Sequence, residues 1–128
     1  MPSFKSILLA TALAASQLVA AEKFRISGQV LNGEGPASRG KMAYWSATAA
    51  DGTKVCDTGK TQKDLPNKFD CDTPGATFEW KENEADATKY DITVCRKEDD
   101  CTSGQLVPTE NAWQCQVFGC SGFGDIGA

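Results

Sequence analysis

Six cysteines constrain the fold of this chain of 128 residues more than any other feature of its sequence. An even number of cysteines in a short exported chain indicates a framework of three disulfides. A domain of this size buries only a modest hydrophobic core, so such cross-links contribute a large share of its stability. All six lie in the last two thirds of the chain: Cys56, Cys71, Cys95, Cys101, Cys115 and Cys120.

The first 21 residues have the organisation of a secretory signal peptide. Lys5 is the only charged residue before Glu22, and the apolar run Ile7–Ala15 is followed by small residues suited to cleavage. The run is shorter than the roughly 20 apolar residues of a membrane-spanning helix. We therefore expect a leader over residues 1–21, a single disulfide-rich β domain over residues 22–128, and a secreted, extracellular product with no membrane partner.

The charge balance argues against nucleic acid as a partner. The full chain carries a net charge of −4, and loss of the leader with Lys5 makes it −5. Binding to nucleic acid or to an anionic membrane needs clustered positive charge. Basic residues gather between positions 39 and 68 and acidic ones between 79 and 100. This pattern favours solvated faces, with a polarised surface that orients a partner as the alternative.

Cys56 and Cys71 bracket fourteen residues, most of them polar. A redox site would have closely spaced cysteines in a βαβ context. A zinc site would have paired short spacings, usually with histidine, and the chain contains no histidine. The spacing therefore predicts a structural staple, and neither a metal nor a cofactor is expected.

Alternating apolar and polar residues predict an all-β fold. About eight short strands and no long helix favour a small antiparallel β-sandwich or barrel. Residues 96–104 are predicted as an exposed loop, and residues 82–89 as an acidic connection with room for one helical turn. The predicted strands cover residues 24–30, 41–48, 53–56, 68–71, 77–81, 90–95, 105–107 and 113–118.

The dipeptide Asp51–Gly52 predicts a tight hairpin, because both residues tolerate a positive φ. A two-residue loop there places Ala47 opposite Cys56. Cys56 then lies on the same face of the sheet as Trp45. We expect the disulfide of Cys56 to pack beside Trp45 in the core.

No catalytic group stands out. The absence of histidine excludes Ser-His-Asp and Cys-His nucleophile systems. Glu79 is the best carboxylate for glycoside hydrolysis, but it occupies the outward position of an alternating strand. Glu98–Asp100 offers oxygen ligands for calcium without the spaced pattern and glycine of a calcium loop. We expect no enzymatic activity.

Three tryptophans are the candidate binding residues. Trp45, Trp80 and Trp113 could form a platform for stacking a sugar, or could line a barrel mouth that holds an aromatic ligand. Tryptophans at such strand positions are more often part of the core.

Three short motifs resemble the major-allergen family of Alternaria and its relatives, which are small secreted fungal proteins. The first is SATAADGTKVC, residues 46–56, followed by KFDC, residues 68–71. The others are VCRKEDDC, residues 94–101, and WQCQV, residues 113–117. The resemblance implies a β-barrel or a sandwich of two packed sheets.

The resemblance also implies a disulfide pairing. It joins Cys56 with Cys71 and Cys95 with Cys115, which leaves Cys101 with Cys120 as a third bridge outside the family pattern. The rival arrangement is Cys95–Cys101 with Cys115–Cys120. The allergen has an N-terminal cysteine used in dimer formation, and this chain has none before Cys56. The expected state is a monomer or a non-covalent dimer.

The family provides the functional expectation. No enzyme activity is established for it, and its relatives are regarded as virulence or elicitor proteins that engage plant defence proteins. The resemblance therefore implies an effector or elicitor that binds a host extracellular protein. A carrier of small, flavonoid-like aromatic ligands is the alternative, and a glycan-active enzyme is the least favoured hypothesis.

Overall fold

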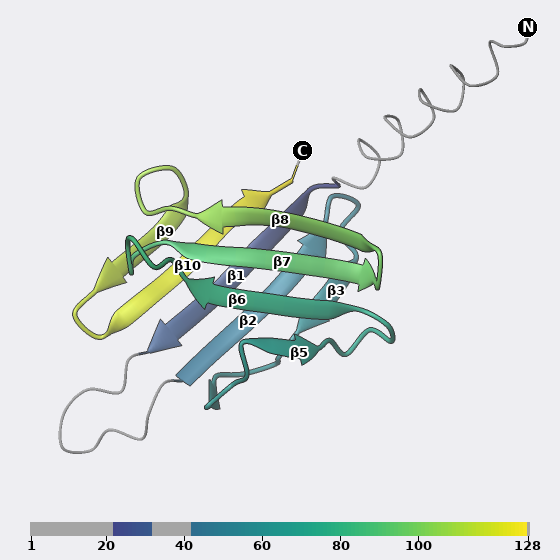
Figure 1. Cartoon of the computed structure of the whole chain (residues 1–128), viewed down its shortest axis with the longest axis horizontal. Helices are drawn as coiled ribbons and strands as arrows, with labels where there is room; N and C mark the ends of the chain where they lie inside the picture. The colour runs from purple at the N-terminus through teal and green to yellow at the C-terminus, as the bar shows by residue number, and fades with distance from the viewer. Residues whose placement is uncertain (1–21, 32–41, 128) are drawn as a thin grey trace, which may run out of the picture.

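The computed structural model describes residues 22–31 and 42–127, which form ten strands in two antiparallel sheets (Figure 1). The sheets lie face to face, and the strands of one cross those of the other obliquely. The sheets are not closed into a barrel, so the all-β sandwich prediction is confirmed and the barrel is not. The predicted leader, residues 1–21, and most of the predicted loop, residues 32–40, lie outside the described residues.

Sheet A contains both the first and the last strand of the domain. Its order is β3-β2-β1-β10-β9, and the short β4 pairs with β2 near one end. Chain ends that are far apart in sequence therefore pair directly, with Phe24 opposite Ile126. The strands are β1 (Phe24–Leu31), β2 (Met42–Ala49), β3 (Lys54–Asp57), β4 (Gln62–Lys63), β9 (Ala112–Gln116) and β10 (Gly119–Ile126).

Sheet B is built from the middle of the chain, in the order β5-β6-β7-β8. The acidic connection before β7 contains no helix among the described residues. Its turn is instead held by the Asn83 side chain, which accepts hydrogen bonds from the backbone amides of Ala85 and Asp86. The strands are β5 (Lys68–Asp70), β6 (Thr77–Glu82), β7 (Tyr90–Lys97) and β8 (Asp100–Leu106).

An aromatic cluster fills the space between the sheets. Trp45 lies at its centre, fully buried, and its ring centroid is 5.6–6.0 Å from those of four other aromatic rings. Burying rings of this size in contact supplies a large part of the stabilisation of a small sandwich. The four neighbours of Trp45 are Phe78, Trp80, Tyr90 and Trp113.

Gly28 makes room for the central indole of Trp45. Trp45, Gly28, Gly122 and Trp113 lie in one row across four neighbouring strands of sheet A. The indoles stack at 5.7 Å with an interplanar angle of 16°. A Cβ on Gly28 would lie 2.2 Å from the Trp45 ring, so a side chain there would displace the indole. The absence of a side chain at Gly28 therefore leaves the space that the Trp45 indole occupies where it stacks on the Trp113 indole of β9.

The first hairpin confirms the residue predicted to lie opposite Cys56 on the neighbouring strand, but not the predicted loop length. Ala47 lies opposite Cys56, and Cys56 and Trp45 belong to the same buried cluster. The turn is longer than two residues, because the amide of Ala49 donates to the carbonyl of Thr53 over 2.8 Å. A β-bulge, where Val55 is the extra residue, restores the register.

The disulfides are Cys56–Cys71, Cys95–Cys101 and Cys115–Cys120. The first was predicted correctly. The predicted Cys95–Cys115 and Cys101–Cys120 bridges are wrong. Cys95 and Cys101 lie on β7 and β8 of sheet B, whereas Cys115 and Cys120 lie on β9 and β10 of sheet A, and each of the four bonds to a cysteine of its own sheet. The observed pairs sit directly opposite each other within hairpins, with Cα atoms 4.0 and 3.9 Å apart.

Candidate functional site

The Cys56–Cys71 loop, defined as residues 57–70, is the candidate functional site. Cys56 belongs to β3 of sheet A, and Cys71 directly follows β5 of sheet B. Their Cα atoms are 4.9 Å apart. Cys56 is fully buried, and the partly buried Cys71 packs against the core. The bridge therefore joins the two sheets at one side of the sandwich and closes the loop there.

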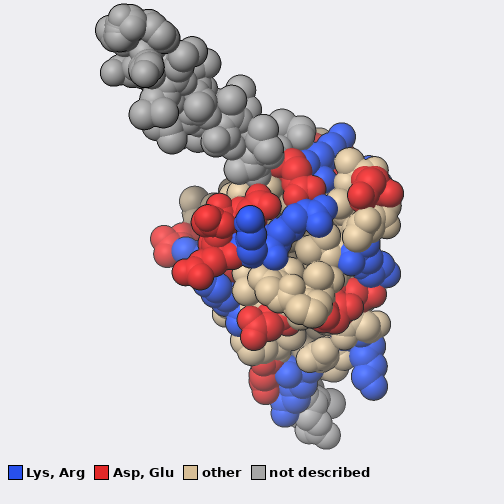
Figure 2. Space-filling model, turned by 90° about the vertical axis from the view of Figure 1, so that its right-hand side faces the viewer, with Lys and Arg blue, Asp and Glu red and all other residues tan. Residues whose placement is uncertain are grey.

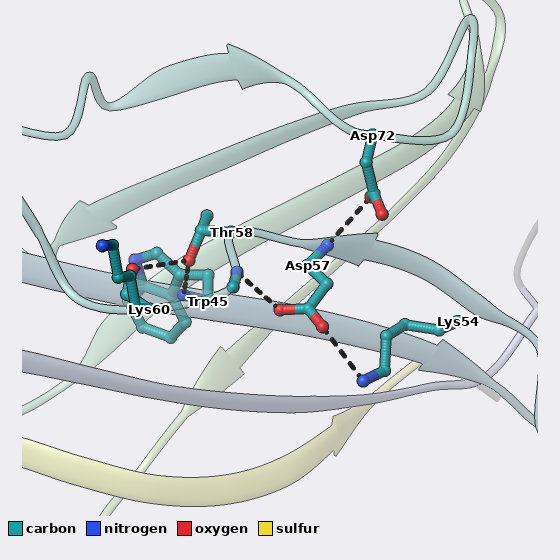
Figure 3. Close-up of polar contacts among 7 residues, drawn as sticks. Trp45, Lys54, Asp57, Thr58, Lys60 and Asp72 are labelled. Carbon is teal, nitrogen blue, oxygen red and sulfur yellow. Dashed lines mark hydrogen bonds and ion pairs between the residues drawn. The ribbon is translucent and has the colours of Figure 1, made fainter.

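Hydrogen bonds fix the first half of the loop to β2 (Figure 3). The amide of Thr58 donates to the carbonyl of Trp45 over 3.0 Å, and the amide of Trp45 donates to the Thr58 hydroxyl over 3.2 Å. That hydroxyl also donates to the carbonyl of Lys60. The Gln62 side chain donates to the carbonyl of Thr58 over 3.1 Å. The loop is thus tied to the strand that carries the central indole.

Asp57 organises the entry to the loop. Its carboxylate accepts a hydrogen bond of 2.8 Å from the Gly59 amide and one of 3.0 Å from the Lys54 ammonium group. Its own amide donates to the Asp72 carboxylate, which lies beyond the disulfide (Figure 3). The Gly59 amide, with a smaller contribution from Lys54, lowers the pKa of the Asp57 carboxyl. The charged form of Asp57 is therefore favoured in the folded protein.

We expect Asp57 to make the fold sensitive to acid. Because its pKa is lower in the folded state than in the unfolded chain, its contribution is present above the unfolded value and disappears as the pH falls through the folded one. Asp57→Asn should lower the free energy of unfolding by about 0.5–1 kcal/mol at pH 7, as expected for a solvent-screened pair. Urea unfolding at pH 7 and pH 3 measures this loss.

The difference between wild type and Asp57→Asn should shrink from pH 7 to pH 3, because the stabilisation from the Asp57 charge decreases as the pH falls below the pKa of the unfolded chain towards the lower pKa of the folded state. Asp70→Asn, at an exposed position of β5, is the matched control. A constant difference at both pH values would contradict the role of the Asp57 charge.

The second half of the loop is fixed to β6. The backbone of Asn67 accepts from the Trp80 amide over 2.8 Å, and its side chain donates to the Trp80 carbonyl over 2.8 Å. The Trp80 indole donates to the carbonyl of Pro66 over 2.9 Å. Each half of the loop is therefore hydrogen-bonded to a strand that carries a buried tryptophan, the first half to β2 of sheet A and the second half to β6 of sheet B.

Leu65 and Pro66 separate two surface hollows. The hollow on the β6 side has a volume of about 500 Å³, and the one on the disulfide side about 390 Å³. Both combine apolar and charged side chains. The first is bordered by Asp64, Asn67, Trp80, Lys81 and Glu82, and the second by Asp57, Thr58, Gln62, Phe69, Asp70, Cys71 and Asp72.

The exposed side chains of the loop carry both signs of charge, with lysines at positions 60, 63 and 68 and aspartates at 64 and 70. Figure 2 shows the same intermixing over the face that it presents, where Lys and Arg alternate with Asp and Glu. This arrangement fits the predicted solvated surfaces, and the alternative of a polarised surface finds no support on that face. The loop can offer a partner paired charges around two hollows.

The tryptophans predicted as binding residues are part of the core. Trp45 and Trp113 have no exposed surface, and Trp80 is 3% exposed. Together with their ring contacts, this burial excludes a stacking platform at Trp45 and Trp113. Trp80 alone borders a hollow.

The carboxylates considered for chemistry are not brought together. Glu79 is exposed on β6, opposite Lys68 and Thr93. Glu98–Asp100 lies at the turn between β7 and β8. Across the two described ranges, no group of three or more His, Cys, Asp or Glu side chains is arranged to hold a metal ion.

Comparisons with known proteins found no matching family model, no matching curated protein and no matching solved structure. Within the described part of the chain, no helix is long and apolar enough to cross a membrane. The site is therefore interpreted from its own geometry.

Proposed function

We propose that this chain is a secreted, effector- or elicitor-like protein that binds a host extracellular protein through the Cys56–Cys71 loop. One observation carries the proposal: the loop is held to both sheets by a disulfide and by hydrogen bonds, while its charged side chains remain exposed. A loop fixed before binding loses little conformational entropy when a partner docks. Binding residues are commonly found on loops positioned by a rigid scaffold.

Secretion is supported by two independent features. The sequence begins with the pattern of a signal peptide, and the described cysteines are all disulfide-bonded. Disulfides persist in extracellular environments and are rare in the cytosol. The resemblance to the Alternaria major-allergen family adds the expectation of a plant defence protein as the partner.

Charge reversal in the loop tests this function. Lys60→Glu/Lys63→Glu should weaken capture of the partner from plant apoplastic fluid at least tenfold, because both residues are exposed and, among the described residues, neither ammonium group forms a hydrogen bond or ion pair that holds the loop. The measurement is a pull-down with tagged protein, followed by a binding titration with the recovered partner.

Lys89→Glu/Lys97→Glu makes the same change in net charge outside the loop and should bind as wild type does. Recovery of no protein by the wild type, together with no response in infiltrated leaves, would overturn the proposal. Equal binding by both double variants would remove the loop from it.

The hollow beside Trp80 favours the carriage of a small aromatic ligand as the second candidate function. Its volume of about 500 Å³ is in the range of small-molecule sites. A flavonol bound there would quench the fluorescence of Trp80. Absence of quenching at high micromolar flavonol would dismiss this candidate, and quenching that survives Trp80→Phe would place the ligand elsewhere.

A further inference from the structure

Strand β9 forms the edge of sheet A opposite to β3, and the sequence around it is free of charge. Residues 111–124 contain no Asp, Glu, Lys or Arg. Ala112, Gln114 and Gln116 of β9 are exposed. In the turn that follows, Val117 is 75% exposed and Phe118 is 70% exposed. This edge therefore combines neutral polar side chains with an apolar end.

The other strands at sheet edges carry charged residues. Lys54 lies on β3 and Lys63 on β4, at the opposite edge of sheet A. Lys68 and Asp70 lie on β5, and Asp100 lies on β8, at the two edges of sheet B. Charged side chains on an edge strand discourage pairing with another chain. Among these strands, β9 alone lacks that protection.

The backbone of β9 presents hydrogen-bonding groups at the edge of the sheet. Cys115 lies directly opposite Cys120 with the Cα atoms 3.9 Å apart, the close spacing of a pair that exchanges no backbone hydrogen bonds. Cys115 and Trp113 therefore direct their amide and carbonyl groups to the free edge of the sheet. The carbonyl of Thr88 accepts from the Trp113 indole, which points between the sheets, so Thr88 approaches β9 from the inner side.

We propose that β9 pairs antiparallel with β9 of a second copy of this chain, about a two-fold axis at Gln114. A two-fold interface must be complementary to itself, and here Gln114 meets Gln114 of the second copy while Ala112 meets its Gln116. The amides can donate to and accept from each other. No like charges face each other, although the whole chain carries a net charge of −4.

The same register gives the exposed turn after β9 a neighbour. Val117 and Phe118 come against residues 110–111 of the second copy, which removes part of their apolar surface from water. The paired sheets A become one continuous sheet, and the two Cys56–Cys71 loops lie at its far ends. The interface is small, so an affinity in the micromolar range is expected.

Sedimentation velocity of the purified secreted protein tests this pairing without any host partner, so its outcome is separate from that of the proposed function. The wild type should show a dimer that dissociates on dilution. Gln114→Lys places two ammonium groups face to face and should raise the dissociation constant at least tenfold. Gln105→Lys, the same change on β8, should leave it unaltered.

Cysteine cross-linking tests the register independently. After mild oxidation, Gln114→Cys should form a covalent dimer in non-reducing electrophoresis, because residue 114 meets itself. Ala112→Cys should not, because residue 112 meets residue 116. A wild type that stays monomeric at about 100 μM, or cross-linking that is equal in the two variants, would overturn the proposal.

Discussion

Trp45→Ala is expected to lower the free energy of unfolding by about 3–5 kcal/mol, the usual cost of truncating a buried aromatic residue. The indole is fully buried and contacts four aromatic rings contributed by both sheets. Its loss leaves a cavity lined by rigid rings, and Gly28 beside it has no side chain with which to fill the space. Urea or thermal unfolding of the purified variant measures the effect.

Phe123→Ala is the control, because Phe123 is an aromatic residue of the same sheet with 43% of its surface exposed. It should lose about 1 kcal/mol or less, since most surface substitutions have small effects. Trp45→Phe should fall between the two, because it keeps a ring but leaves part of the space empty. A Trp45→Ala variant as stable as Phe123→Ala would contradict the central position of the indole.

Cys56→Ala/Cys71→Ala is expected to have the second large effect. The bridge spans a sequence separation of 15, for which the chain-entropy model gives a stabilisation of about 3 kcal/mol. Its loss also frees one side of the sandwich and releases the loop. We therefore expect both a lower unfolding midpoint and a loss of partner binding, measured by unfolding and by the pull-down.

Cys115→Ala/Cys120→Ala provides the comparison. This bridge spans a separation of only 5, so the same model gives about 2 kcal/mol. Partner binding should persist, because the bridge lies at the opposite edge of sheet A from the loop. Loss of binding in this variant, with binding retained in Cys56→Ala/Cys71→Ala, would contradict the assignment of the site.

The parts of the fold that were predictable are those with local signals. Alternation along residues 24–30 and 90–95 identified β1 and β7, because a half-buried strand shows its two faces directly in the sequence. Ala47, the residue opposite Cys56 on β2, was identified by counting outward from Asp51–Gly52. That count succeeded because the longer turn and the bulge at Val55 compensate each other.

The parts that were missed depend on pairing between distant segments. The segment GCSGFGDI forms β10, whose many glycines do not favour a strand by propensity. It forms one because it lies between β1 and β9 and pairs with both, and a Cβ on Gly122 would lie only 1.9 Å from the carbonyl oxygen of Ala112 on β9. Residues 100–104, predicted as a loop, are paired in β8 in the same way.

The candidate site was predicted only in part. The sequence identified Cys56 and Cys71 as a staple, but it directed attention to tryptophans that prove to be buried. The available signal was Leu65–Pro66, an apolar pair in the middle of a polar segment, which separates the two hollows. Which strand each half of the loop contacts depends on the packing of two sheets, and no local pattern encodes that.

The three bridges join neighbouring cysteines in chain order, first with second, third with fourth and fifth with sixth. In a chain exported N-terminus first, both members of a pair become available before the next pair emerges. If this chain is exported as proposed, oxidation would proceed stepwise during translocation, and each correct bond would form before a competing thiol arrives. This connectivity lets the order of synthesis select one pairing from the fifteen that six cysteines allow.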